Sequence, residues 1–389
     1  MLRKPLLSGL VVALAACSSH QSPVASPPSA PSPTFTLRGQ FNISALTEFP
    51  ETSGLRFGGI SGLAPTSAEG EFLGVSDDHD SVRIYRLRAS ADGSEFRMQP
   101  LDYIRLQQPG SDLSSLDPES LALTPEGHML IVSEGMGSAE PRLPPAVLEF
   151  GPDGAFIRAL TVRERFVPNP TGPLVRGVRS NIGFESIAIT PLGRVLVGTE
   201  SSIVQDGDLT TFDHGAPARI IEYVRQGARY EPAREFVYMV EPVHRPPFDP
   251  GLAVNGLVDL LALDEHVLLA LERSYVAEAG DTGRDMNKIR LFRIDLRGAT
   301  DVSRVDSLKD APSVTPVAKT ALFDLSQVPG LSPDLAPSLD NFEALAFGPL
   351  FPDGRVSVIL ASDDNFNRAQ RTWFLLFAVD GLTRPQRIQ

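Results

Sequence analysis

The chain has 389 residues, enough for one large domain or two ordinary ones, and 42% of them are hydrophobic while 21% are charged. This composition supports a sizeable core and excludes a chain that is disordered throughout. The formal net charge of −13 argues against a nucleic-acid partner, because phosphate backbones select for basic surfaces, and it favours cations instead.

The N-terminus carries a targeting signal. Arg3 and Lys4 precede a short apolar run over residues 6–14, and the segment ends in Leu-Ala-Ala-Cys17, which resembles the lipobox of bacterial lipoproteins. We expect residues 1–16 to be a signal peptide and Cys17 to be lipidated. The alternative, a retained membrane anchor, needs roughly 18 or more apolar residues. Cys17 is the only cysteine, which excludes an internal disulfide or a CxxC metal site.

Residues 17–33 follow as a tether rich in Pro and Ser, and residues 34–389 are expected to form one domain. The lipid would be the only membrane contact. Ser18 after the lipidated cysteine resembles the sorting pattern of Gram-negative outer-membrane lipoproteins, so we expect a cell-envelope protein at the periplasmic face of the outer membrane in such a host. We also expect a monomer.

The domain contains an internal repeat with two apolar elements in each copy. The first element occurs at residues 59–64, 118–123, 184–189, 257–262 and 342–347. The second, a continuous apolar run ending in a carboxylate, occurs at residues 71–78, 128–134, 194–200, 266–272 and 356–364. Turn signals such as Thr-Pro-Glu-Gly127 and Thr-Pro-Leu-Gly193 separate the two elements, so each copy begins with a β-hairpin.

A third strand-like run follows in every copy, and a fourth follows in the first four copies. The fifth copy lacks a fourth run, whereas residues 34–45 form a strand-like run that belongs to no copy. Adding this N-terminal run to the last copy would close a ring and pair two bare sheet edges. We therefore predict an all-β fold, a single β-propeller of five blades. A sixth blade within residues 301–337, or two packed β domains, are the alternatives.

Acidic residues recur at the same places in these repeats. Glu119, Glu185, Asp259 and Glu343 lie in the first element, and Asp77, Asp78, Glu134, Glu200, Glu272, Asp363 and Asp364 end the second. Antiparallel neighbours bring the start of one strand and the end of the next to the same rim. The repeats therefore predict eleven carboxylates at one mouth of the central channel.

Crowded carboxylates repel one another unless cations neutralise them. Oxygen ligands favour Ca²⁺ before Mg²⁺, so we expect Ca²⁺ held by Asp77, Asp78, Glu119, Glu134, Glu200, Asp259, Glu272, Asp363 and Asp364. The structural alternative is that these acids accept backbone hydrogen bonds or pair with Arg83, Arg179, Arg273 or Arg368.

The same residue types suit ester hydrolysis. Arg179 and Arg273 would hold a phosphate, and an acid such as Glu185 or Glu343 would act on a water activated by the cation, without a covalent enzyme intermediate. No GxSxG elbow, HExxH, P-loop or Rossmann fingerprint occurs. His79 beside Asp78 leaves a Ser-His-Asp esterase as an alternative.

Three segments resemble the repeated signatures of the esterase-like phytase family. They are residues 179–188, residues 255–259 with 271–274, and residues 340–349 with 362–366. The resemblance extends over about residues 50–380. It implies a propeller and suggests hydrolysis of a phosphate or carboxylic ester. Because fold alone does not decide function, a propeller that binds a ligand or a protein without catalysis remains the alternative.

Overall fold

The computed structural model describes residues 32–385 apart from 51–52, 79–80, 93–94, 109–112, 114–115, 278–285, 312 and 336–337. The predicted signal peptide, Cys17, almost all of the tether and His79 lie outside the described residues. The described residues from Pro33 onward form one compact unit. In the part of the chain that is described, no helix is both long and apolar enough to cross a membrane.

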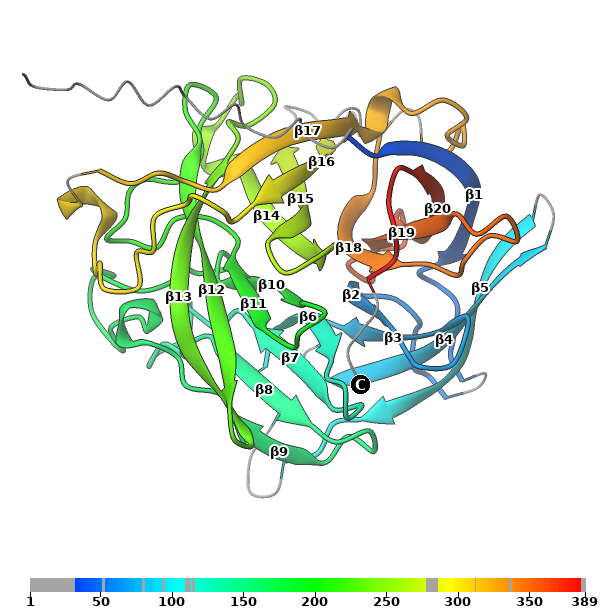
Figure 1. Ribbon diagram of the computed structural model, residues 1–389, viewed down its shortest axis with the longest axis horizontal. Helices are drawn as coiled ribbons and strands as arrows, with labels where there is room; N and C mark the ends of the chain where they lie inside the picture. Colours follow the sequence, from blue (N-terminus) through cyan, green and yellow to red (C-terminus); the bar gives the residue numbers. More distant parts are fainter. Residues whose placement is uncertain are drawn as a thin grey trace, which may run out of the picture. The chain divides into compact units, whose positions relative to one another are not determined.

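Strands β1–β20 form five four-stranded antiparallel sheets, the blades of a propeller (Figure 1). Blade 1 contains β2 (Ile60–Pro65), β3 (Glu71–Ser76), β4 (Arg83–Asp92) and β5 (Glu95–Arg105). Blade 2 contains β6 (Pro118–Leu123), β7 (Met129–Ser133), β8 (Ala146–Phe150) and β9 (Phe156–Ala159). Blade 3 contains β10 (Phe184–Ile189), β11 (Val195–Thr199), β12 (Ala216–Gln226) and β13 (Arg229–Val240). Blade 4 contains β14 (Ala253–Ala262), β15 (Val267–Val276), β16 (Asn287–Asp295) and β17 (Ala318–Asp324).

Blade 5 is built from both ends of the propeller. It contains β18 (Asn341–Phe347), β19 (Val356–Asp363), β20 (Arg371–Asp380) and, as its outermost strand, β1 (Thr34–Ser44). Strand β1 pairs antiparallel with β20 from Thr34 opposite Asp380 to Ser44 opposite Arg371. The predicted ring closure by an N-terminal strand is therefore confirmed. The described residues of 301–337 contain only β17 and short 3-10 turns, and the propeller has five blades.

The hydrophobic core lies between neighbouring blades. One cluster packs Leu269 and Leu291 of blade 4 against Leu345, Leu360 and Phe377 of blade 5. The other clusters repeat this arrangement around the ring. Such packing between faces explains why the second strands are continuous apolar runs, since both of their faces are buried.

Each innermost strand is interrupted by one bulge. The register shifts at Ser61 in β2, Glu119 in β6, Glu185 in β10, Val258 in β14 and Glu343 in β18. A bulge leaves one residue out of the ladder and redirects its side chain. These five residues therefore occupy equivalent positions, on strands that surround the centre of the ring in Figure 1.

Candidate functional site

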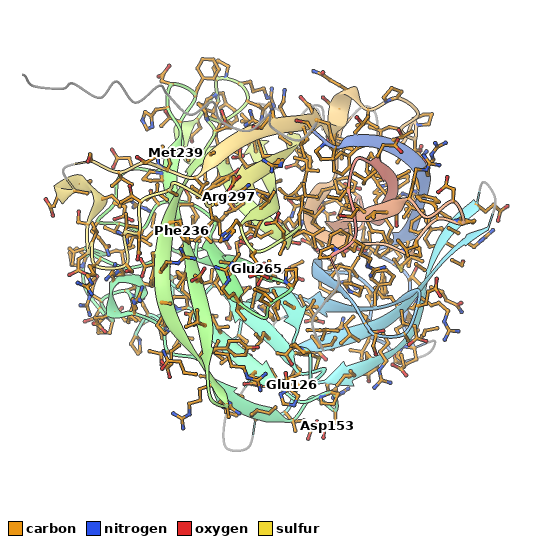
Figure 2. The ribbon with its side chains drawn as sticks, viewed as in Figure 1. Glu126, Asp153, Phe236, Met239, Glu265 and Arg297 are labelled. Atoms are coloured by element: carbon orange, nitrogen blue, oxygen red, sulfur yellow. The ribbon has the colours of Figure 1, made fainter. Side chains whose placement is uncertain are left out.

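A second set of equivalent residues lies beside the bulges, at the end of each second strand. The residues are Asp77, Glu134, Glu200, Arg273 and Asp363. The backbone amides of the first three donate to the carbonyls of Gly59, Asp117 and Gly183. Arg273 pairs with Gly256 and Asp363 pairs with Asn341 across the hairpin. Bulge residues and second-strand residues thus meet at one end of the channel. The hairpin turns between first and second strands lie at the other end, and Glu126 and Glu265, which Figure 2 labels, belong to two of these turns.

Blade 4 departs from the acidic pattern at both positions. Its bulge residue is Val258, and Arg273 takes the place of the carboxylate at the end of the second strand. Asp259 and Glu272, which the repeats predict at these positions, are each displaced by one residue from the equivalent position. A shift of one residue turns a strand side chain to the opposite face.

Seven of the predicted acids come together with one further acid that the sequence analysis missed. We call this set the acidic cluster: Asp77, Asp117, Glu119, Glu134, Glu185, Glu200, Glu343 and Asp363. Asp117, Glu119 and Glu134 have carboxylate oxygens within 4.8 Å of one another. Asp117 has no carboxylate counterpart in the other blades, so the repeat gave no signal for it.

Electrostatic effects link the members of the acidic cluster around the channel. Burial, then the charges of Glu185 and Glu134, raises the pKa of Glu119. Burial, then the charges of Glu200, Glu134 and Glu343, likewise raises the pKa of Glu185. Burial, then Asp77 and Glu343, raises the pKa of Asp363. Without a cation these carboxyl groups therefore favour the protonated form.

Two further members of the cluster, Glu134 and Glu200, also have raised pKa values. Burial and the neighbouring Asp117 raise the pKa of Glu134 to about 10, although the Gly183 N–H donates to its Oε2 at 3.0 Å. Burial raises the pKa of Glu200 only to about 7, because the positive charge of Arg273 opposes the rise. Glu200 therefore changes charge close to neutral pH.

Arg273 provides fixed positive charge inside the acidic cluster. Its Nη2 donates to Glu343 Oε1 at 2.7 Å and lies 3.8 Å from Glu200 Oε1. The charges of Glu343, Glu200 and Glu185 outweigh the effect of burial and raise its pKa. The structural alternative, an acid paired with an arginine, is thus realised for Glu343.

Four other predicted residues have structural partners outside the cluster. Asp78 pairs with Arg83 at 2.5 Å, and Asp364 accepts hydrogen bonds from the Gly59 and Phe366 amides and from Thr372. Glu272 accepts from the Tyr238 hydroxyl at 2.7 Å and pairs with Lys319. Arg179 donates to the carbonyls of Ser202 and Gly207. Each of these four side chains is thus held by hydrogen bonds or ion pairs within or between blades.

The family of the chain follows from a comparison with known sequences. The sequence profile described as "Phytase-like: Esterase-like activity of phytase" matches residues 55–366. The chain belongs to this family. Among curated protein sequences none matches the phytase-like chain.

Solved structures resemble the phytase-like propeller only distantly. They include a hypothetical protein from Leishmania major (12% identity, 88% of this chain and 90% of that chain, TM-score 0.35) and a luciferin-regenerating enzyme (11%, 85% and 82%, TM-score 0.35). A putative gluconolactonase matches with 14% identity over 81% of this chain and 73% of its own, with a TM-score of 0.33. At these values the likeness supports no statement about activity.

The acidic cluster of the phytase-like propeller fits a hard cation. Glycines let the carboxylates approach the neighbouring backbone, since a Cβ at Gly256 would lie 2.2 Å from Glu200 Oε1. Glu200 Oε1 and Ser61 Oγ are buried and have no hydrogen-bond partner among the described residues. Unsatisfied buried oxygens beside crowded carboxylates are the donor set that Ca²⁺ prefers.

Proposed function

We propose that this phytase-like propeller is an envelope hydrolase, anchored by lipid on Cys17, that cleaves a phosphate or carboxylic ester with the help of Ca²⁺. The observation that carries the proposal is the acidic cluster with Arg273 inside it. The carboxylates provide a place for a cation, and Arg273 provides donors for an anionic oxygen.

Asp117, Glu119 and Glu134 are the residues that would hold the cation, because their oxygens already lie within 4.8 Å of one another. A bound Ca²⁺ would supply positive charge that polarises an ester oxygen and favours ionisation of water. Glu119 and Glu134, whose pKa values are raised, must lose their protons to bind it. Cation binding and proton release are therefore coupled.

Arg273 would orient the substrate. A guanidinium offers several donors in one plane and can bind two oxygens of a phosphate or carboxylate at once. In the free protein Arg273 donates to Glu343, so an anionic substrate would compete with Glu343 for these donors. This competition favours substrates with more than one anionic oxygen.

Glu200 is the best general base in the cluster. Its pKa of about 7 lies close to neutral pH, and its Oε1 has no hydrogen-bond partner within the described residues. A base whose pKa lies near the working pH is deprotonated in a large fraction of the molecules and still binds a proton strongly enough to remove it from water. Glu200 would therefore take the proton from the attacking water.

A panel of chromogenic phosphate and acyl esters, assayed with Ca²⁺ and with EDTA, tests the proposal. Turnover that requires Ca²⁺ supports it. Acyl-ester turnover that EDTA leaves unchanged would point to a serine esterase. Silence on every ester, with Ca²⁺ still bound, would point to a binding propeller.

Two arginine variants sharpen this test. Arg273→Gln should raise KM for phosphate esters by about tenfold or more, since a charged hydrogen bond is lost. Arg179→Gln is the matched control, because Arg179 donates to backbone carbonyls outside the acidic cluster. Equal KM values for the wild-type protein and Arg273→Gln would remove Arg273 from substrate binding.

A further inference from the structure

Asp259 lies inside the ring of innermost strands and bonds to three of its elements. Its Oδ1 accepts from the Ser120 hydroxyl at 3.2 Å and from the Leu260 amide at 2.8 Å, and its Oδ2 accepts from the Leu345 amide at 2.7 Å. Ser120 belongs to blade 2 and Leu345 to blade 5. One carboxylate of blade 4 therefore joins the innermost strands of three blades.

The other blades have only small residues at the equivalent position, which follows the bulge. These residues are Gly62, Ser120, Ser186 and Ala344. A Cβ at Gly62 would lie 2.7 Å from the Ser120 Cα, so the innermost strands of blades 1 and 2 are already in close contact. Blade 4 thus provides the long side chain that bridges the remaining space.

The bonds of Asp259 end next to members of the acidic cluster. Ser120 directly follows Glu119 in β6, and Leu345 comes two residues after Glu343 in β18. On its other side, Asp259 lines a cavity of about 1030 Å³ at the turn end of the channel. Asp259 therefore lies between this cavity and the acidic cluster.

We propose that Asp259 is a positioning residue that holds Glu119, through the neighbouring Ser120, in place relative to β18 and so determines the Ca²⁺ affinity of the acidic cluster. This inference rests on the proposed function for the cation and its site, but not for the hydrolysis. Asp259 itself does not contact the cation in this proposal, because its oxygens accept the hydrogen bonds of Ser120, Leu260 and Leu345.

The test measures Ca²⁺ binding to the full mature protein by isothermal titration calorimetry, below the melting temperature of every variant. Asp259→Ser introduces the residue that blades 2 and 3 have at this position. It should weaken Ca²⁺ binding by about 10-fold to 100-fold, the usual effect of losing a residue that orients ligands. Asp259→Asn keeps the shape but loses one acceptor, so its affinity should lie between those of Asp259→Ser and the wild-type protein.

Glu265→Ser is the matched control for lost contacts between blades. Glu265 also joins two blades, since it accepts from Thr190 and from the Leu192 amide of blade 3, but it lies at the turn end. The Ca²⁺ affinity of the Glu265→Ser protein should stay within about twofold of the wild-type value. A merely structural role for Asp259 predicts equal effects of Asp259→Ser and Glu265→Ser on affinity.

Ca²⁺ affinity and ester turnover separate the possible outcomes. Wild-type affinity in both Asp259 variants, or in Asp259→Asn if Asp259→Ser does not fold, overturns the positioning role and leaves the proposed function intact. Weakened Ca²⁺ binding in a protein that hydrolyses no ester supports the positioning role and rejects the hydrolase. A wild-type protein that binds no Ca²⁺ overturns both.

Discussion

Among single residues, Glu200 combines burial, an unsatisfied oxygen and a pKa of about 7. We expect Glu200→Gln to lower kcat by about 100-fold or more, the usual contribution of a general base. The wild-type kcat/KM should rise with pH to a midpoint no higher than about 7, because a bound cation favours the charged carboxylate. Steady-state kinetics between pH 5 and 9 measure both effects.

Glu126→Gln is the control for this substitution, because Glu126 lies at the turn end and pairs with Arg225. Its kinetics should match those of the wild-type protein. If Glu200→Gln keeps the rise with pH, another group is the base. Glu185 would be the next residue to test, since burial and the neighbouring charge of Glu200 raise its pKa as well.

At the scale of elements, the repeats are enough to predict the strands and the closing role of residues 34–45, because burial on both faces and turn signals are local properties. The repeats do not identify which residues of blade 4 are equivalent to the acids of the other blades. Glu119 and Glu134 are 15 residues apart, as are Glu185 and Glu200, and the same spacing connects Val258 to Arg273. The nearest acids in blade 4 are Asp259 and Glu272, each one residue away from these positions. The bonds of Asp259 depend on residues in distant blades, which no local pattern reveals.

Strand β1 closes the ring, so its contacts should contribute to the stability of the fold. Phe35 packs edge-on against Phe323 at 5.2 Å and also contacts Phe377, so it joins the closing strand to blades 4 and 5. Phe35→Ala should lower the free energy of unfolding by about 2 kcal/mol, less than for a fully buried ring because Phe35 is only partly buried. Urea denaturation measures the change.

The neighbouring Thr36 is exposed on the same strand, so Thr36→Ala should change the free energy of unfolding by less than about 0.5 kcal/mol. Equal effects of the two substitutions would show that the aromatic contacts of β1 contribute little to ring closure. A separate early transition in Phe35→Ala would show instead that blade 5 opens before the rest of the ring.

For the whole molecule, the acidic cluster makes stability depend on pH and on Ca²⁺. A carboxyl group whose pKa is higher in the folded than in the unfolded state stabilises the fold below its unfolded pKa. This contribution is lost as pH rises through the folded pKa. Glu200 and Glu134, with folded pKa values of about 7 and about 10, place the loss between pH 5 and 10. In EDTA, the free energy of unfolding should fall over this window by an amount on the order of a few kcal/mol.

Ca²⁺ should oppose this loss, because it neutralises the same carboxylates and binds only the folded cluster. Its stabilising effect, measured as a shift of the melting temperature, should therefore increase from pH 5 to pH 9. Carboxylates with lowered pKa values, such as Asp295 and Asp324, do not affect stability between pH 5 and pH 9. Their stabilising contribution is lost only when pH falls below about 4. The double variant Glu134→Gln/Glu200→Gln should show a flatter pH dependence in EDTA and a smaller response to Ca²⁺. An unchanged pH dependence of stability in this variant would mean that other carboxyl groups of the chain cause the loss of stability with rising pH.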